Sequence, residues 1–416
     1  MRSLLGYLFA CSVLTSNAQV LQKADLVDEW TRGEARTGIA KGFKMAENQP
    51  EPVCAVELYQ VKYWSTGVTG EKTLLSGLIA LPIISKCKGL VAFMHGTTAV
   101  RDNVPSRMRY DGQWSYETWL VTLALGNGGY AIAAPDYIGQ GDSPGVHPYV
   151  LGSVNAASGI DILKAAKELA AQKHRNLGSK LYVTGYSEGG SNAMWLARKI
   201  EEANDPDLVL TAAAPVSGPY DLSGAQADGM LATQTSLMDV AVRLFFMSYF
   251  AYGLNKNYNA PPLEEVFIPS FATYVPVVFG RDFTIDNDYV KQLAVKGLQL
   301  GTFRSVSRVL TDPIKKAIDS KDKSNAVVEA MLEQDCIDWS PKAPLYLLGI
   351  PGDNMVVFQN TLNAIAAMRK RGLTRDRVNY HALDTKGLNH LNACGPLMSW
   401  VRRYFDEGFS GVPLDD

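Results

Sequence analysis

The chain has 416 residues, of which 47% are hydrophobic and 20% are charged, and its formal net charge is −2. This composition is typical of a soluble globular protein with a large core, built as one domain with an insertion or as two domains. The near-neutral charge gives no electrostatic reason to expect a nucleic acid or an anionic surface as a partner.

Residues 1–18 are typical of a secretory signal peptide. Arg2 gives a short positive start, residues 3–15 are largely apolar, and Ser16-Asn17-Ala18 offers small residues at the cleavage positions. The apolar run is too short to span a bilayer. A less favoured alternative is a lipoprotein leader, in which Cys11 would be lipidated. The sequence therefore predicts an exported protein, either secreted or periplasmic.

Beyond the leader, short apolar runs predict strands. The first two flank residues 67–70 and predict a hairpin, whereas the later runs are near-continuously hydrophobic, as in strands buried on both faces of a parallel sheet. Helix-like segments alternate with them, which predicts an α/β fold with helices on both faces. The eight predicted strands are Val53–Trp64, Leu74–Leu81, Leu90–His95, Tyr130–Pro135, Leu181–Gly185, Leu210–Val216, Leu345–Gly349 and Val378–Leu383. The predicted helices are Tyr116–Leu125, Asn155–Lys173, Gly190–Glu202, Val356–Arg371 and Leu397–Phe405.

One interval breaks this alternation. No buried strand is evident between Val216 and Leu345, and the interval is too long for a loop, so we predict an inserted helical lid. Its aromatic run at 244–250 either lines a substrate pocket or packs in the core of the lid. A transmembrane helix is excluded by the short apolar length and by Asp239 and Arg243. The predicted divisions are a signal peptide (1–18), an N-terminal extension (19–50), a first core part (51–218), the lid (219–338) and a second core part (339–416).

The pentapeptide Gly185-Tyr186-Ser187-Glu188-Gly189 stands between a predicted strand and a predicted helix. A serine hydroxyl needs a base within reach before it can act as a nucleophile. A sharp strand-to-helix turn presents the serine to that base, and it needs flanking glycines because side chains there would collide. The G-x-S-x-G pattern alone is weak, but this setting is the one that the motif requires. The sequence therefore predicts Ser187 as a nucleophile.

A histidine must take the serine proton, and a carboxylate must orient that histidine. Of the five histidines, His390 is favoured because it lies in a loop between the last predicted strand and the final helix. Asp353 follows the seventh predicted strand and is favoured as the carboxylate. The chain order Ser187, Asp353, His390 supports this assignment. The alternatives are His381 for the base and Asp338 or Asp384 for the acid.

Acyl transfer also needs prepositioned donors for the oxyanion of the tetrahedral intermediate. The backbone N–H of Glu188 is the first predicted donor, because it lies at the start of a helix where the dipole favours negative charge. The second is Thr97, which follows His95-Gly96 just after the third predicted strand. A plain turn at the end of this strand is the alternative.

Together these motifs resemble those of the α/β-hydrolases, over the chain from Val53 to the C-terminus. The chain looks most like the secretory lipase or esterase group, which carries Asp-Tyr-x-Gly after the fourth core strand and a helical lid before the strand bearing the acid. The resemblance implies a mostly parallel, eight-stranded sheet with an inserted lid and a structural role for Asp136. Glu188 departs from the group, and a carboxylate there would favour neutral or cationic acyl groups. The residues that carry the resemblance are His95-Gly96-Thr97, Pro135-Asp136-Tyr137-Ile138-Gly139, Ser187, Asp353 and His390.

Four cysteines remain once the leader is removed, and in an exported protein they predict disulfides with three pairings to choose from. The predicted hairpin brings Cys54 close to Cys87, which favours that pair and leaves Cys336 with Cys394. Free buried thiols are the alternative. A zinc site is not expected, because C-x-x-C spacing is missing from the sequence.

The sequence thus predicts an exported serine hydrolase that cleaves lipid or short-chain carboxylic esters through an acyl-enzyme. No metal or organic cofactor is implied, because the triad and its donors complete the chemistry. The predicted partner is a small-molecule or lipid ester, with transient contact with a lipid interface as an open option and the oligomeric state undefined. Two alternatives stay open: a serine peptidase, in which Glu188 would hold the peptide amine, and a non-catalytic binding protein on the same fold.

Overall fold

The computed structural model of the protein describes residues 19–98, 100–109, 115–233, 236–258, 261–279, 287–303 and 305–415. The predicted signal peptide and Cys11 lie outside these ranges. Export and lipid anchoring therefore stay predictions.

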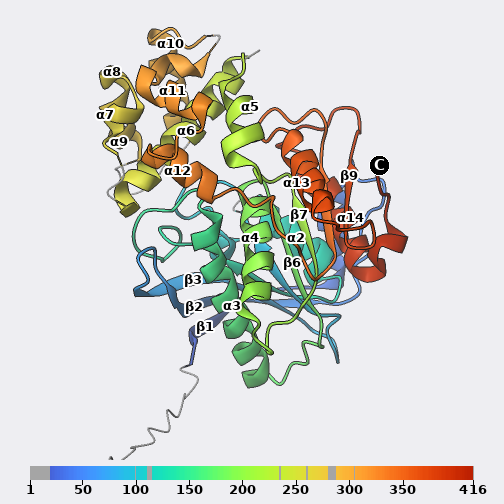
Figure 1. Ribbon diagram of the computed structural model, residues 1–416. Helices are drawn as coiled ribbons and strands as arrows, with labels where there is room; N and C mark the ends of the chain where they lie inside the picture. The colour runs from blue at the N-terminus through green and yellow to red at the C-terminus, as the bar shows by residue number, and fades with distance from the viewer. Residues whose placement is uncertain are drawn as a thin grey trace, which may run out of the picture.

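A nine-stranded sheet in the order β1-β2-β3-β5-β4-β6-β7-β8-β9 forms the centre of the protein (Figure 1). The pairs β1–β2, β2–β3 and β3–β5 are antiparallel, and all pairs from β5 through β4 to β9 are parallel. The mostly parallel sheet and the first hairpin are thereby confirmed. The strands are β1 Leu21–Trp30, β2 Val56–Thr66, β3 Lys72–Pro82, β4 Leu90–Met94, β5 Ala131–Pro135, β6 Leu181–Tyr186, β7 Leu210–Val216, β8 Leu345–Gly349 and β9 Val378–Ala382.

The predicted count of eight strands was wrong, because β1 lies in the N-terminal extension. It pairs with β2 alone, at the edge of the sheet, and most of its side chains are exposed between the buried Leu21 and Trp30. A polar edge strand of this kind has neither an apolar run nor a clean alternation to reveal it. The extension continues into α1 (Arg32–Gly42), which begins with a capping box formed by Thr31 and Glu34.

Helices cover both faces of the sheet, as predicted, and each face has its own apolar core. On one face α3, α4 and α13 pack against the strands through small and aliphatic side chains, and on the other face α1, α2 and α14 do so. The bounds are α2 Tyr116–Val121, continued by a π-helical turn Thr122–Gly126, α3 Gly152–Gln172, α4 Glu188–Ala203, α13 Gln359–Lys370 and α14 Cys394–Glu407.

The interval between β7 and β8 forms a helical lid, which stands above one end of the sheet (Figure 1). The lid has an apolar core of its own, separate from the two cores of the sheet. Its longest helix is α6 (Leu237–Tyr258), and the prediction that this segment is too short to span a membrane was wrong, because the helix is long and apolar enough by length and composition. However, 67% of its most apolar stretch is buried within the protein. The other lid helices are α5 Ala227–Leu231, α7 Leu263–Val266, α8 Pro269–Ala272, α9 Val275–Phe279, α10 Asn287–Gln299, α11 Asp312–Ser320 and α12 Ala326–Glu333.

The predicted disulfides are not formed, because all four described cysteines are free and buried. Cys336 packs in the core beneath α3 and α4, whereas Cys394 begins α14 on the opposite face of the sheet, so their thiols are separated by the strands. The Cys54 thiol contacts the backbone carbonyls of Gly126 and Asn127, and it is not bonded to Cys87. Burial raises the pKa of the Cys87 thiol to about 11, so it is protonated at neutral pH.

Candidate active site

Ser187 occupies the sharp turn between β6 and α4, with φ 59° and ψ −126°, a backbone conformation that is unfavourable for a side chain. The flanking glycines are required by close backbone approach. A Cβ atom on Gly185 would lie 2.1 Å from the carbonyl oxygen of Gly189, and one on Gly189 would lie 1.9 Å from that of Met94. The elbow predicted from the pentapeptide is therefore present and holds the serine at the end of β6.

The structure brings the three predicted triad residues together. His390 Nε2 lies 2.8 Å from Ser187 Oγ, and His390 Nδ1 lies 2.6 Å from Asp353 Oδ2. The three side chains come from different loops at the carboxyl end of the sheet, and all three are buried. This line of hydrogen bonds matches a serine activated by a histidine that a carboxylate orients.

Further contacts fix the positions of Asp353 and His390. The amides of Met355 and Val356 both donate to Asp353 Oδ1 at 2.9 Å, so the second carboxylate oxygen is left for the histidine. Tyr186 donates through its hydroxyl to the backbone carbonyl of His390 at 2.5 Å, and the two rings stack. Since these partners fix the imidazole from two sides, its Nε2 stays directed at the serine.

The alternative triad residues lie elsewhere. His381 pairs with Asp415, Asp338 pairs with Arg371 on the surface, and Asp384 is exposed. Asp136 has the structural role predicted for it: it is fully buried and accepts hydrogen bonds from the Ser106 amide and the Ser76 hydroxyl. None of these groups contacts Ser187 or His390 in the part of the chain that the structure describes.

Both predicted oxyanion donors lie beside the serine. The amide of Glu188 opens α4, and Thr97 lines the same cavity as Ser187 and His390. The neighbouring amides of Gly96 and Gly190 are already used, by Glu117 and by the carbonyl of Ser187 respectively. Within the described ranges, neither the Thr97 amide nor the Glu188 amide donates to another protein group, so both remain free for an oxyanion.

The Thr97 loop is fixed by several side chains. The Thr97 hydroxyl lies 3.1 Å from that of Tyr149, and Tyr137 donates to the carbonyl of His95. His95 stacks on Tyr137, and burial lowers the pKa of His95 to about 4, so its ring is neutral at physiological pH. The loop is therefore preorganised, as an oxyanion site requires.

The side chain of Glu188 is turned away from the reacting centre. Its Oε1 lies 2.8 Å from His147 Nε2 and accepts the amide of Val150 at 3.1 Å. Its Oε2 is enclosed by protein and has no hydrogen-bond partner among the described residues. The Glu188 carboxylate was predicted to select among acyl groups. No contact in the structure supports this prediction, because the carboxylate is hydrogen-bonded to His147.

Two cavities meet at Ser187. The apolar cavity, of about 900 Å³ including its open part, lies between the sheet and the lid and is lined by Ser187 and Glu188 but not by His390. The second cavity, of about 1380 Å³ including its open part, is lined by Ser187, Thr97, His390 and Glu117. Most of its wall is apolar, but it carries more polar groups than the first cavity, and we call it the polar cavity. Phe246 of α6 lines both cavities, so part of the predicted aromatic run faces a pocket. Its neighbours Leu244 and Tyr249 belong to the core of the lid.

Glu117 is a site residue that the sequence did not reveal. It lies on α2, yet its Oε2 accepts the amide of Gly96 at 2.7 Å, next to the predicted oxyanion loop. Burial raises the pKa of Glu117 to about 7, against the lowering effect of the Gly96 amide and of His390. A single carboxylate at the start of a predicted helix is an ordinary helix feature, so no sequence signal marks it.

The described ranges hold no group of three or more His, Cys, Asp or Glu side chains that could bind a metal ion.

Searches against protein-family models and against curated proteins found no match. Solved structures do match. A candidate hydrolase of Legionella pneumophila is 26% identical, with a TM-score of 0.79 over 95% of this chain and 100% of that one. The ligand-bound cell-wall-degrading esterase LipA of Xanthomonas oryzae is 22% identical, with a TM-score of 0.76 over 94% and 98%.

More distant matches include the closed state of lipase A from Candida antarctica, at 14% identity and a TM-score of 0.60 over 92% of this chain and 82% of that one. These likenesses extend over nearly the whole chain, lid included. The architecture is therefore shared as a unit with these hydrolases, and the arrangement at Ser187 is suited to acyl transfer to a serine hydroxyl.

Proposed function

Because this chain is a member of the α/β-hydrolase superfamily, we propose that it hydrolyses carboxylic esters through an acyl-enzyme formed on Ser187. The single observation that carries this proposal is the unbroken hydrogen-bond line from Asp353 through His390 to Ser187, with distances of 2.6 and 2.8 Å. A serine with only a structural role would not require a histidine at hydrogen-bond distance that a carboxylate orients. It would also not require the strained backbone of the turn.

In the first half-reaction, His390 Nε2 takes the proton of Ser187 as the Oγ atom attacks the ester carbonyl. The resulting oxyanion accepts hydrogen bonds from the amides of Thr97 and Glu188. When the intermediate collapses, the bond to the alcohol oxygen breaks, and His390 gives its proton to that oxygen. Asp353 stabilises the imidazolium throughout.

In the second half-reaction, a water molecule takes the place of the alcohol. His390 removes its proton as the water oxygen attacks the acyl carbonyl, and the same two amides hold the second oxyanion. Collapse breaks the bond to Ser187 Oγ, His390 returns the proton to it, and the carboxylic acid leaves. The proton transfers to and from Ser187 use side chains that are already in contact at the elbow.

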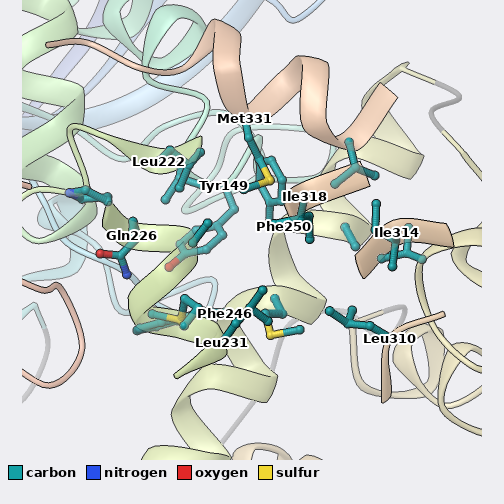
Figure 2. A pocket seen from close by; sticks show the side chains of 18 of the residues that line it. Tyr149, Leu222, Gln226, Leu231, Phe246, Phe250, Leu310, Ile314, Ile318 and Met331 are labelled. Carbon is teal, nitrogen blue, oxygen red and sulfur yellow. The ribbon is translucent and has the colours of Figure 1, made fainter. Parts of the chain in front are cut away.

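The apolar cavity supports an ester with an uncharged hydrocarbon acyl group. Figure 2 shows its walls, in which lid side chains such as Phe250, Ile314, Ile318 and Met331 lie around the space together with Tyr149. Among the described residues of its wall, the carboxylate is that of Glu188, which is paired with His147. Burying an acyl chain there removes apolar surface from water at roughly 25 cal/mol per Å².

A serine peptidase would use the same triad, but it needs a group that holds the peptide amine. Glu188, the residue predicted for that task, binds His147 and the Val150 amide through Oε1, and its Oε2 is enclosed by protein. This arrangement favours an ester over a peptide as the substrate.

The test is a substrate panel assayed with the wild type and with Ser187→Ala. We expect the wild type to turn over p-nitrophenyl butyrate far faster than an aminoacyl-p-nitroanilide. The variant should fold normally and lose at least about three orders of magnitude in kcat. Comparable turnover by the variant would remove Ser187 from the mechanism, and a preference for the anilide would assign a peptidase instead.

A further inference from the structure

The two cavities at Ser187 are distinguished by which of them contains His390. In ester cleavage the leaving alcohol oxygen must receive its proton from His390, so the alcohol part of the substrate lies on the side of that histidine. Only the polar cavity, of the two, is lined by His390, and it is also lined by Thr97 and Leu391. The acyl part is left to the apolar cavity. This assignment rests on the proposed function.

The two carboxylate oxygens of Glu117 differ in their surroundings: one is hydrogen-bonded to the protein, and the other is available in the polar cavity. Oε2 accepts the amide of Gly96 at 2.7 Å. Oε1 lies against the same glycine, where a Cβ atom would be 2.6 Å from it, and no hydrogen bond reaches it from the described residues. The side chain is half-buried and lines the cavity, so this second oxygen is open to a bound molecule.

A carboxylate oxygen that has no hydrogen-bond partner becomes costly once a ligand displaces water from it. A hydrocarbon alcohol would leave the oxygen in that state, whereas a hydroxyl or a cationic group would satisfy it. Asn103 lies on the wall of the same cavity, where its Oδ1 accepts the Ser115 amide and its NH2 group remains as a donor for a hydroxyl. The remaining wall is partly apolar, with Val100, Phe246 and Met355, and suits the carbon frame of the alcohol.

We propose that the polar cavity binds the alcohol moiety of the ester and that Glu117 recognises a hydroxyl or a cationic group on it. Its Oε2 bond to Gly96 holds the carboxylate in place next to the oxyanion loop, and Oε1 accepts from the substrate. The preferred substrates are then esters of apolar acids with polyhydroxy or cationic alcohols.

The protonation of Glu117 gives this recognition a pH dependence. Its pKa is raised to about 7, so the carboxylate is mostly charged above pH 7 and mostly neutral below it. A cationic alcohol should therefore be favoured increasingly as the pH rises through 7. Glu117 interacts electrostatically with five other titratable groups, so that the charge of one affects the pKa of the other. They are His390, Glu188, Cys394, Tyr186 and Tyr137.

The experiment compares butyrate esters in matched pairs that share an acyl group and differ in the alcohol. Choline butyrate is paired with its neutral isostere 3,3-dimethylbutyl butyrate, and glyceryl monobutyrate is paired with propyl butyrate. Each kcat/KM is divided by the alkaline hydrolysis rate of the same ester to remove differences in leaving-group reactivity. We expect at least one polar member to exceed its partner by roughly 10-fold or more.

A preference for choline assigns a cationic alcohol, and a preference for glycerol assigns a hydroxylated one. In Glu117→Gln the amide oxygen can still accept from Gly96, but the charge is gone, so the preference should fall by roughly 10-fold. Asp384→Asn is the matched control: it removes one exposed carboxylate from the loop before His390 and should leave the ratios unchanged.

The pH dependence is measured on the wild type, which keeps the proposal testable even if Glu117→Gln unfolds. The choline preference should rise between about pH 6 and pH 8. Equal rates within both pairs, or a preference that survives intact in a folded Glu117→Gln, would overturn the alcohol site while leaving the esterase standing. Failure to hydrolyse any of the four esters would instead count against the proposed function itself.

Discussion

The two cavities at Ser187 are built from different parts of the molecule. The apolar cavity is made mainly of lid side chains, including Phe250, Ile314 and Met331. The polar cavity is made mainly of loops at the carboxyl end of the sheet, with Thr97, Glu117 and His390 on its wall. Changes in the lid should therefore alter which acyl group is accepted, whereas changes at the sheet should alter the chemistry.

The difference also separates two kinds of interaction. The sheet side is ordered by short hydrogen bonds to named partners, such as the Gly96 amide on Glu117 and the two amides on Asp353. The lid side is ordered by apolar packing, which is non-directional and tolerates changes of shape. Substitutions on the sheet side should thus have large, position-specific effects, and those on the lid side should have graded ones.

The largest effect is expected from Asp353→Asn, which should lower kcat by roughly 10³- to 10⁴-fold because the imidazole loses its orienting charge. Steady-state kinetics on p-nitrophenyl butyrate measure this loss. Asp338→Asn is the control, since Asp338 pairs with Arg371 on the surface and should keep nearly full activity. If kcat fell more in Asp338→Asn than in Asp353→Asn, Asp353 would not be the carboxylate that orients His390.

A smaller loss, of roughly 10²- to 10³-fold in kcat, is expected from Thr97→Pro because proline removes the N–H that holds the oxyanion. Thr97→Ala keeps that N–H and loses only the hydroxyl contact with Tyr149, so its loss should be far smaller. Thermal unfolding of both variants checks that the loop change leaves the fold intact. Equal losses in the two variants would show that the hydroxyl, and not the amide, matters.

On the lid side we expect a change in acyl preference. Ile318→Trp fills part of the apolar cavity (Figure 2) and should lower the ratio of octanoate to butyrate turnover by roughly 10-fold, since a few methylenes lose their space. Ile318→Val, which enlarges the cavity slightly, should leave the ratio nearly unchanged or raise it. A ratio that is insensitive to tryptophan would place the acyl chain elsewhere.

The smallest effect on catalysis is expected from Asp136, which lies in neither cavity. Burial raises its pKa from 3.8 to about 6, so the folded state keeps a proton that the unfolded state has released. The free energy of unfolding should therefore fall as the pH rises from about 4 to about 6, and Asp136→Asn should remove up to about 3 kcal/mol of this fall. Urea unfolding of both proteins across this range measures it, and parallel curves would contradict the assignment.

The sequence was sufficient to predict the elements that carry a local signal. The parallel strands were recognised because they are short, near-continuous apolar runs, and β1 was missed because it is polar and exposed at the sheet edge. The elbow was recognised because its glycines are required within the pentapeptide itself. The positions of Asp353 and His390 followed from chain order, and the structure places both within hydrogen-bond distance.

Features that depend on contacts between distant segments were outside the reach of the sequence. The predicted disulfides failed because Cys336 and Cys394 lie on opposite faces of the sheet, which no spacing reveals. Glu117 meets Gly96 only because α2 packs beside the end of β4.

The sequence by itself thus determined the strands, the elbow and the order of the triad, since each rests on periodicity or on steric limits within a few residues. Only the tertiary structure decided how the lid and the sheet divide the space around Ser187 into an apolar and a polar cavity. The physical reason is that a cavity is the space left when distant segments pack, and its polarity depends on which side chains those segments turn toward it.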